Sequence, residues 1–341
     1  MEKVRFGIIG VGNMGSSHAK KFLGGEIENG VLTAICDLKP EKMQTILELE
    51  GGSVLKTFTD YKEMYASGEI DAVIVAVPHY FHPQLSIDAL NAGIHVVCEK
   101  PAGVYTKQVK EMNEVAKKSD KLFTMMFNQR TNCVYRKIRE MVQNGELGEI
   151  KRVNWIVTDW YRSQFYYDSG DWRGTWAREG GGVMINQALH TLDLLQWICG
   201  MPTHVTAEIA TWRLKDVIEV EDTATARFEC ESGLPINFFA TTAAGASLPI
   251  SIQMNLSDKK RVCAQNKILL VNDEPVALPA ADAVLPGKDV WGGEHVTLIR
   301  AFYRCLLTGQ HFPIDVEEGG RVVRLILSMY RSRGERIEII S

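Results

Sequence analysis

Three glycines near the start of the chain have the spacing of a dinucleotide-binding turn. Gly10, Gly12 and Gly15 follow the apolar segment Val4–Ile9 as G-x-G-x-x-G. The first glycine permits a tight turn, the second has no side chain to block a pyrophosphate, and the third lets the next helix pack closely on the strand. A helix predicted from Ser16 onward would offer its first N–H groups to an anion. The spacing therefore predicts a site for a phosphate-bearing ligand.

An acidic residue ends the second apolar segment, as expected for ribose binding. Asp37 follows the predicted strand Leu32–Cys36, at about the 20-residue offset seen in dinucleotide sites. A carboxylate there accepts a hydrogen bond from a ribose 2′-hydroxyl and repels a 2′-phosphate. Leu38 and Lys39 follow it without the arginine that is typical of NADP sites. The sequence therefore favours NAD over NADP, although the positive charge of Lys39 could also accommodate a 2′-phosphate. It also disfavours the alternative that the glycine turn binds no ligand.

Alternating strands and helices position this turn. From Val4 to about Thr124 the order is that of right-handed βαβ units, which predicts a doubly wound α/β domain with a parallel sheet. The predicted strands are Val4–Ile9, Leu32–Cys36, Ala72–Val77, His95–Cys98 and Leu122–Met126. The predicted helices are Ser16–Leu23, Pro40–Leu49, Tyr61–Ala66, Pro83–Asn91 and Thr106–Lys118. The glycine turn and the loops 78–82 and 99–101 would leave the carboxyl edge, where such sheets bind ligands.

After Met126 the strands alternate apolar and polar residues. This period of two predicts a mixed or antiparallel sheet with one covered face. The strands are predicted at Ile150–Trp160, Val205–Trp212, Thr223–Cys230, Ile236–Thr242 and Ile250–Asn255, with a hairpin over Val262–Val271. Helices are predicted at Cys133–Gln143, Glu294–Thr308 and Val316–Arg331. We therefore expect two domains, 1–124 and 125–341, and a homodimer or homotetramer that forms through the uncovered face.

The composition is that of a globular protein. The 341 residues are 45% hydrophobic and carry a net charge of -4 without a basic patch, which disfavours nucleic acid and anionic membranes as partners. No apolar run reaches the length of a membrane span, and no signal peptide precedes the first strand. The seven cysteines form no metal-ligand pattern. We expect a cytoplasmic protein with reduced cysteines and no bound metal.

Four motifs in order resemble the Gfo/Idh/MocA oxidoreductases. They are GVGNMG at 10–15, AVPHYFH at 76–82, AGIHVVCEKP at 92–101 and GGGVMINQALHTLD at 180–193. The resemblance covers nearly the whole chain. It implies an N-terminal Rossmann domain, a C-terminal domain with an open sheet, and NAD(P)-dependent oxidation or reduction of a hydroxyl on a sugar, polyol or glycoside. The cofactor-binding residues that it implies are Gly10, Gly12, Asn13, Met14, Gly15, Asp37, Val77, Pro78, His82, Glu99 and Lys100.

The resemblance also implies catalytic roles for a lysine and a histidine. Lys100 would lie beside the nicotinamide, where its charge stabilises an alkoxide or polarises a carbonyl. The bond between Lys100 and Pro101 is often cis in relatives of this family. His190 is expected to be the general base, because histidine exchanges protons near neutral pH.

The predicted helix Val183–Ile198 carries His190 and a departure from the family. Asn186, His190, Asp193 and Trp197 would share one helical face. Many relatives have aspartate where this chain has Asn186, and there both residues share the proton transfer. Asparagine hydrogen-bonds a hydroxyl but takes no proton and supplies no charge. The chemistry should then rest more on His190 and Lys100, or else catalysis is weakened or altered.

Aromatic and charged residues are crowded into one segment before this helix. The aromatic residues are Trp160, Tyr161, Phe165, Tyr166, Tyr167, Trp172 and Trp176. Aromatic rings stack on the apolar face of a pyranose, so the segment is a candidate substrate wall, although packing at an interface explains any single ring equally well. The substrate-binding residues predicted are Asn128, Arg130, Tyr161, Trp172, Arg173, Asn186 and His190.

Two other functions remain open from the sequence. Transient oxidation at a sugar carbon could permit elimination of a glycosidic substituent, with no net redox change. Alternatively, the fold could serve as a non-catalytic sensor of NAD or sugar, since a fold does not establish activity. Asn186 supports the sensor hypothesis, whereas Lys100 and His190 oppose it.

Overall fold

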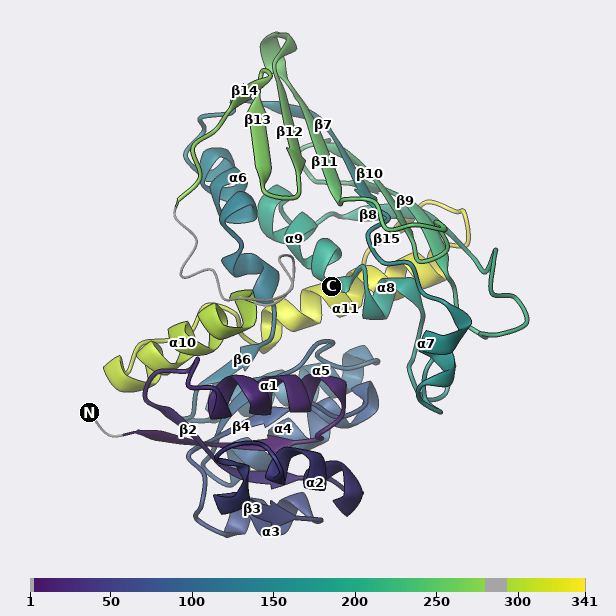
Figure 1. Cartoon of the computed structure of the whole chain (residues 1–341). Helices are drawn as coiled ribbons and strands as arrows, with labels where there is room; N and C mark the ends of the chain where they lie inside the picture. The colour runs from purple at the N-terminus through teal and green to yellow at the C-terminus, as the bar shows by residue number, and fades with distance from the viewer. Residues whose placement is uncertain (1–2, 280–292, 341) are drawn as a thin grey trace. The chain divides into compact units, whose positions relative to one another are not determined.

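A computed structural model describes residues 3–279 and 293–340 of the chain, with elements labelled as in Figure 1. Contacts divide the described residues into two compact units. The first comprises 3–128 and 293–320, and the second comprises 129–279 and 321–340. The sequence pattern, which placed a border near residue 124, did not anticipate that 293–320 packs with the first unit.

The first unit is built on a parallel sheet with the strand order β3-β2-β1-β4-β5-β6. The strands are β1 (Val4–Ile9), β2 (Gly30–Cys36), β3 (Lys56–Phe58), β4 (Ala72–Val75), β5 (His95–Cys98) and β6 (Phe123–Met125). The predicted doubly wound fold is confirmed, with its winding reversed between β1 and β4. The sequence prediction missed β3, because this short edge strand has no buried apolar face.

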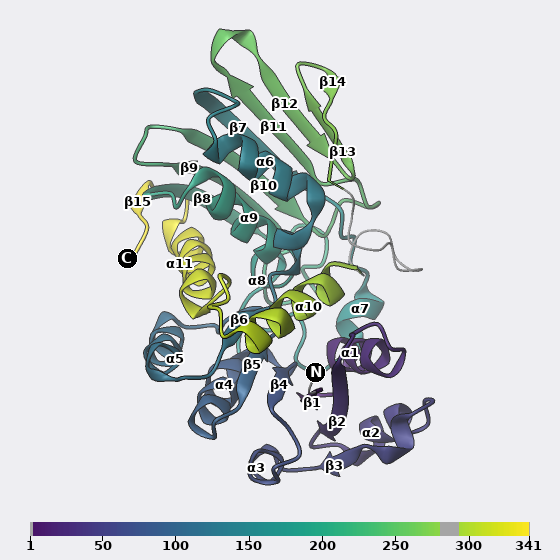
Figure 2. The same cartoon turned by 90° about the vertical axis from the view of Figure 1, so that its left-hand side faces the viewer.

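Helices lie on both sides of this sheet (Figure 2). In the first unit they are α1 (Asn13–Leu23), α2 (Pro40–Leu47), α3 (Tyr61–Ala66), α4 (His82–Asn91), α5 (Thr106–Lys118) and α10 (Gly293–Thr308). α1 contacts α2, and α4 contacts α5. All four residues of β4 are fully buried, as expected for a parallel strand covered on both faces. Single 3₁₀ turns occur at Gly52–Val54, His79–Phe81, Asn128–Thr131 and Ser257–Lys259.

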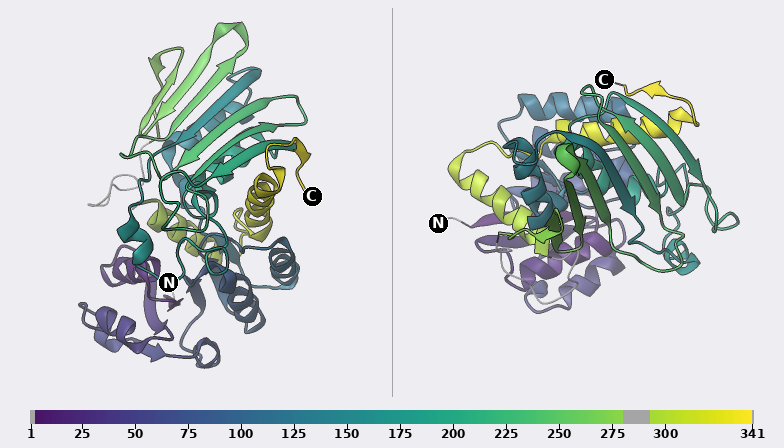
Figure 3. Two further views of the ribbon diagram at one scale, coloured as in Figure 1. Left: turned by 90° about the vertical axis from the view of Figure 1, so that its right-hand side faces the viewer. Right: turned by 90° about the horizontal axis from the view of Figure 1, so that it is seen from above.

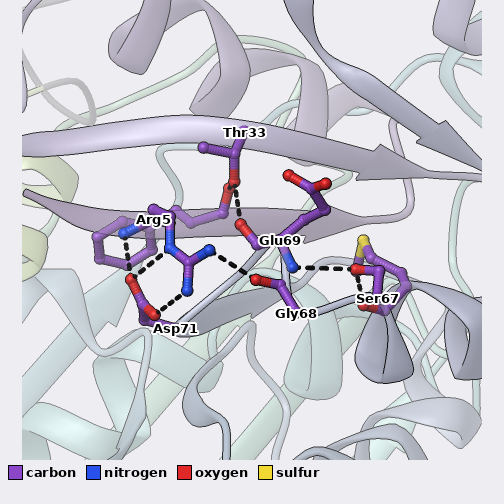
Figure 4. Close-up of polar contacts among 8 residues, drawn as sticks. Arg5, Thr33, Ser67, Gly68, Glu69 and Asp71 are labelled. Carbon is purple, nitrogen blue, oxygen red and sulfur yellow. Dashed lines mark hydrogen bonds and ion pairs between the residues drawn. The ribbon is translucent and has the colours of Figure 1, made fainter.

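A polar network connects strands at the amino edge of the sheet (Figure 4). The glycine turn lies at the opposite edge. Asp71, just before β4, accepts hydrogen bonds from the backbone N–H of Arg5 at 2.9 Å and from its guanidinium at 2.6 and 3.1 Å. The guanidinium also donates to the carbonyl of Gly68 at 2.6 Å. Because the pair is partly exposed, we expect it to contribute little stability.

Residues 293–320 complete the first unit. Leu298, Ile299 and Phe302 of α10 are fully buried. After the helix, the carbonyl of Ile314 accepts a 3.0 Å hydrogen bond from the backbone N–H of Met125 in the edge strand β6. The segment therefore joins both the core and the sheet edge.

The second unit is built on a mixed sheet with the order β14-β13-β12-β11-β7-β10-β9-β8-β15. The strands are β7 (Ile150–Val157), β8 (His204–Ala210), β9 (Thr223–Glu229), β10 (Pro235–Thr241), β11 (Ser251–Leu256), β12 (Arg261–Gln265), β13 (Ile268–Val271), β14 (Glu274–Pro275) and β15 (Ile337–Glu338). Among the described strands of this second sheet, β7 and β10 pair in parallel and every other neighbouring pair is antiparallel. The predicted, mostly antiparallel sheet and its hairpin over β12 and β13 are confirmed.

The helices of the second unit lie mainly on one face of this sheet. They are α6 (Cys133–Gln143), α7 (Gln164–Asp168), α8 (Val183–Asn186), α9 (Leu189–Cys199) and most of α11 (Val316–Ser332). Figures 1 and 2 show α6 and α9 against the sheet, and Figure 3 shows the face turned away from them. Val153, Trp155 and Val157 of β7 are buried, whereas Ile156 between them is 40% exposed.

The helix predicted over Val183–Ile198 is interrupted, so the prediction of one continuous helix was wrong. α8 ends at Asn186 and α9 begins at Leu189, with Gln187 and Ala188 between them. The even spacing of polar residues along one face therefore does not extend from Asn186 to the residues of α9.

In the described ranges, each helix is too short or too polar to cross a lipid bilayer.

Candidate functional site

The glycine turn of the first unit makes tight contacts at two of its three glycines. Gly10 has a φ of 84°, and a Cβ there would lie 2.5 Å from the carbonyl oxygen of Ala76. A Cβ on Gly15 would lie 1.8 Å from the carbonyl oxygen of Gly10. In contrast, a Cβ on Gly12 would meet nothing within 4 Å. The turn thus needs glycine at residues 10 and 15 for its own packing, and leaves open space beside Gly12.

Helix α1 begins directly at this turn, which exposes its first N–H groups. The backbone N–H of Ser16 donates to the carbonyl of Gly12 at 2.9 Å. The N–H groups of Asn13, Met14 and Gly15 precede this first helical bond, and no acidic side chain lies in the first turn of α1. Such a helix start attracts anions.

Asp37 lies at the end of β2, beside the turn. One oxygen of its carboxylate accepts a 2.9 Å hydrogen bond from the backbone N–H of Val11, and the other accepts a 3.0 Å hydrogen bond from the backbone N–H of Lys39. Because β1 and β2 are neighbours, the carboxylate and the open backbone at Gly12 lie at the same edge of the sheet.

The ends of β4 and β5 meet this same edge. The backbone N–H of Ala76 donates to Ile9 at 2.9 Å, and that of Glu99 donates to Val75 at 2.9 Å. Val77 and Pro78 follow Ala76, and Lys100 follows Glu99. The parallel sheet therefore collects the predicted cofactor residues of four strand ends. Lys100 is half-buried, and its bond to Pro101 is cis.

His82 joins two of these loops. Its Nδ1 lies 2.7 Å from the carbonyl oxygen of Pro101, and its Nε2 lies 2.8 Å from the carbonyl oxygen of Val77. The ring is 1% exposed, and this burial lowers the pKa of His82. With both nitrogens directed at backbone carbonyls, His82 can affect a cofactor through the loops it holds.

Glu99 forms a buried pair with His18 of α1. Its Oε1 lies 2.8 Å from Nε2 of His18, whose ring packs edge-on against His295 of α10 at 5.5 Å. Burial acts to raise the pKa of Glu99. The hydrogen bond and charge of His18 outweigh this effect, with smaller contributions from His295 and Lys100, and hold the pKa at about 2.

Asn128, predicted to bind substrate, is fully buried in the first unit. Its Nδ2 lies 3.4 Å from Nδ1 of His295.

Asn186 joins a cluster of side chains in the second unit. Its Nδ2 donates to Oε1 of Glu179 and lies 3.4 Å from the hydroxyl of Tyr166. The guanidinium of Arg173 donates to that hydroxyl at 2.5 Å and lies 4.5 Å from the ring centre of Trp172. Asn186, Arg173 and Trp172 from the predicted substrate set are thus connected. Tyr161 lies apart from these contacts, with Arg213 at 5.1 Å from its ring centre.

His190 and Arg130 occupy buried positions in the second unit. His190 is the second residue of α9 and is 8% exposed. Arg130 donates twice to the carboxylate of Asp193 on the same helix, at 2.8 and 2.6 Å. This buried pair indicates a structural role for Arg130, whereas its predicted contact with substrate stays a prediction.

Two buried glutamates escaped the sequence analysis. Glu179 directly precedes Gly180, and Glu221 precedes β9. Glu221 accepts hydrogen bonds from the backbone N–H groups of Gly182 and Met184 and from the hydroxyl of Tyr330. Burial outweighs these donors and raises the pKa of Glu221 to about 7. Glu179 and Glu221 each lie in a loop without periodicity, so no local pattern indicated their burial.

Across the described ranges, no three His, Cys, Asp or Glu side chains gather as a metal site would require.

Models of known protein families match both halves of the chain. Residues 4–127 match an oxidoreductase family with an NAD-binding Rossmann fold. Residues 135–257 match the C-terminal domain of the same family. The chain belongs to the Gfo/Idh/MocA family. The predicted resemblance is therefore confirmed, and the first unit carries the NAD-binding Rossmann fold of Gfo/Idh/MocA oxidoreductases.

Several Gfo/Idh/MocA relatives are dehydrogenases. Myo-inositol 2-dehydrogenase of Thermotoga maritima is 29% identical over 197 residues, which are 58% of this chain and 55% of the relative. D-glucoside 3-dehydrogenase of Escherichia coli is 31% identical over 203 residues, again 58% and 55% of the two chains. The matched segment spans about half the length of these curated relatives.

A solved Gfo/Idh/MocA structure covers the whole chain. The WlbA dehydrogenase from Bordetella pertussis, in complex with NADH and UDP-GlcNAcA, has a TM-score of 0.83 and 29% sequence identity. The match covers 100% of both chains. The two chains therefore share one fold over the residues that the structure describes.

Proposed function

We propose that this protein is an NAD-dependent dehydrogenase acting on a hydroxyl group of a sugar, polyol or glycoside. The observation that carries the proposal is the open backbone at Gly12 beside the carboxylate of Asp37. The names of the inositol and glucoside dehydrogenases among the relatives support the substrate class. The proposed division of roles follows the predicted domains, with 1–124 for NAD and 125–341 for substrate and assembly.

The residues of the first unit fit a dinucleotide. Space beside Gly12 admits a pyrophosphate that a side chain there would displace. The N–H groups of Asn13, Met14 and Gly15 would bind its oxygens, with Gly10 shaping the turn. Asp37 would accept hydrogen bonds from the adenosine ribose and repel a 2′-phosphate, which favours NAD over NADP. The residues proposed to complete this site are Val77, Pro78, Glu99 and Lys100, with His82 acting through the two loops it holds.

The chemistry assigns one role to each catalytic residue. Bound NAD supplies the hydride acceptor for oxidation or, when reduced, the hydride donor. A ring nitrogen of His190 takes the proton of the reacting hydroxyl, and the ammonium of Lys100 stabilises the negative charge on that oxygen. Asn186 binds a hydroxyl without exchanging a proton. Tyr161, Trp172 and Arg173 are proposed to contact the sugar, together with Asn128 and Arg130.

NADH formation tests this function. The panel contains aldoses, inositols, sugar acids and simple glycosides, and wild type is compared with His190→Ala and Lys100→Ala. We expect kcat to fall by a factor of about 10² to 10⁴ in each variant. NAD binding should be retained in His190→Ala, because His190 is not among the residues proposed to bind NAD. Asp71→Asn, at the opposite edge of the Rossmann sheet, is the control that keeps its activity.

Two outcomes would redirect the proposal. If both variants turn over within tenfold of wild type, the assigned roles are wrong. Release of an aglycone without NADH accumulation would indicate the redox-neutral use of the same hydride step, and NAD binding without any turnover would favour a sensor.

The sheet of the second unit supports a proposed assembly. Ile156 of β7 and Phe239 of β10 are neighbours in register, and both point away from the buried row of Trp155 and Phe238. Apolar side chains at the centre of a partly exposed face favour contact with a second copy. We propose a homodimer or homotetramer through this face, which sedimentation of the purified protein would detect and a purely monomeric species would exclude.

A further inference from the structure

Glu179 is a buried carboxylate that contacts Asn186. Glu179 is only 2% exposed. One carboxylate oxygen accepts a 2.5 Å hydrogen bond from the backbone N–H of Gly174, and the other accepts a hydrogen bond from Nδ2 of Asn186. The backbone N–H of Glu179 donates to the carbonyl of Thr175 at 3.0 Å. The carboxylate is therefore held in one place by the turn that carries it.

This contact determines which way the Asn186 amide faces. Both oxygens of Glu179 accept hydrogen bonds, one from Gly174 and one from Nδ2 of Asn186, so the amide presents its NH₂ group to Glu179. The second hydrogen of that NH₂ group is directed at the hydroxyl oxygen of Tyr166, at 3.4 Å. Any further partner that the Asn186 side chain meets is then met by its oxygen, which accepts a hydrogen bond from a hydroxyl.

Tyr166 extends the same arrangement. Its hydroxyl oxygen accepts from Arg173 at 2.5 Å as well as from Asn186. The guanidinium carbons of Arg162 and Arg173 lie 4.2 and 4.3 Å from its ring centre. The carboxylate of Glu179 offsets part of this positive charge. The cluster therefore contains both the charge and the hydrogen-bond partners that orient Asn186.

We propose that Glu179 is a positioning residue that fixes the Asn186 amide with its oxygen toward a substrate hydroxyl. This inference rests on the proposed function. Substrates that offer a hydroxyl donor at this point are selected, and those that lack it bind more weakly, because the amide cannot turn to donate instead.

Thermal unfolding against pH tests the pairing without any substrate. Asn186→Asp places two carboxylates in contact, so the pKa of one of them rises in the folded state. The melting temperature of this variant should fall further below that of wild type as pH rises through the raised pKa. In the double variant Glu179→Gln with Asn186→Asp, an amide again faces a carboxylate, and the difference from wild type should disappear.

Other ionisable groups near Glu179 are present in all of these proteins. They are Tyr166, Tyr167 and Tyr330, together with Arg162 and Arg173 beside Tyr166 and Glu221 beside Tyr330. The difference between the melting curves therefore isolates residues 179 and 186. Glu219→Gln is the matched control, since it removes an exposed carboxylate that accepts from the backbone N–H of Trp176 at 3.1 Å. If Asn186→Asp shows the pH dependence of wild type, or the double variant fails to restore it, the pairing is wrong.

Kinetics test the orientation of the amide. In Glu179→Gln the side-chain oxygen is needed by the backbone N–H of Gly174, so the new NH₂ group faces Asn186 and favours the opposite orientation of its amide. We therefore expect kcat/KM to fall about tenfold or more, mainly through KM. Glu219→Gln should leave both constants unchanged. An unchanged kcat/KM in Glu179→Gln overturns the orientation argument. If wild type turns over no substrate of the panel, the proposed function fails, while the melting curves still decide whether Glu179 and Asn186 are coupled.

Discussion

The carboxylate of Asp37 accepts a 2.9 Å hydrogen bond from the backbone N–H of Val11, inside the glycine turn. The residue that we propose to distinguish NAD from NADP therefore also supports the turn that would bind the pyrophosphate. Substitution by asparagine can remove the charge at this residue and keep the hydrogen bond from Val11.

Asp37→Asn should weaken the preference for NAD over NADP. The asparagine oxygen still accepts from the N–H of Val11, whereas its NH₂ group cannot accept from the exposed N–H of Lys39. The charge that repels a 2′-phosphate is lost. We expect the ratio of the two dissociation constants, measured by calorimetry, to shift toward NADP by about tenfold. Asp71→Asn removes a carboxylate at the amino edge of the same sheet and should leave the ratio unchanged. Equal ratios in wild type and Asp37→Asn would contradict the role of the charge.

The glycines of the turn should respond in opposite ways to alanine. Gly12→Ala places a methyl group where nothing lies within 4 Å, so stability should be retained while NAD affinity falls. Gly15→Ala forces a methyl group against the carbonyl oxygen of Gly10 and should cost about 1–3 kcal/mol or more of stability. Melting temperature and NAD titration separate the two effects. A destabilised Gly12→Ala with normal NAD affinity would refute the assignment of the open space to a pyrophosphate.

Glu99 should stabilise the first unit above acidic pH. Its pKa falls from an ordinary value of 4.5 to about 2 in the folded state, so its contribution is present above pH 4.5 and is lost as pH falls toward 2. The pair with His18 then contributes up to about 3 kcal/mol. Glu99→Gln should lower the melting temperature at neutral pH. It should also reduce the fall in melting temperature that wild type shows between pH 4.5 and about 2. The variant and wild type should converge at the acid end, and a constant difference across the range would count against the pair.

Ionisation of Glu221 should destabilise the second unit as pH rises, opposite to the effect of Glu99 on the first unit. Its pKa rises from 4.5 to about 7 on folding, so the folded protein binds its proton more tightly than the unfolded chain. Stability that is present below pH 4.5 is lost as pH rises through about 7, by roughly 3 kcal/mol. Glu221→Gln keeps an acceptor for Tyr330 and should remove this decline in melting temperature. A decline that persists in the variant would assign it to another group.

Much of the first unit was predictable because its signals are local. The spacing of Gly10, Gly12 and Gly15, the acid at Asp37 and the apolar segments each depend on neighbours along one element. Parallel strands then bring their carboxyl ends to one edge, which collects Val77 and Lys100 without further information. The edge strand β3 escaped because exposed residues carry no periodic pattern.

Contacts between distant segments were decided by the tertiary structure. Nothing in the spacing indicated that Arg130 pairs with Asp193, that Glu179 contacts Asn186, or that 293–320 packs with the first unit. The pattern over Val183–Ile198 likewise suggested one helix, although the chain breaks it at Gln187 and Ala188. The sequence by itself determined most of the strands and helices and the cofactor turn, because apolar period and glycine spacing act within one element. Only tertiary packing decided the partner of each buried charge, because that partner is whichever group the fold brings within hydrogen-bond distance.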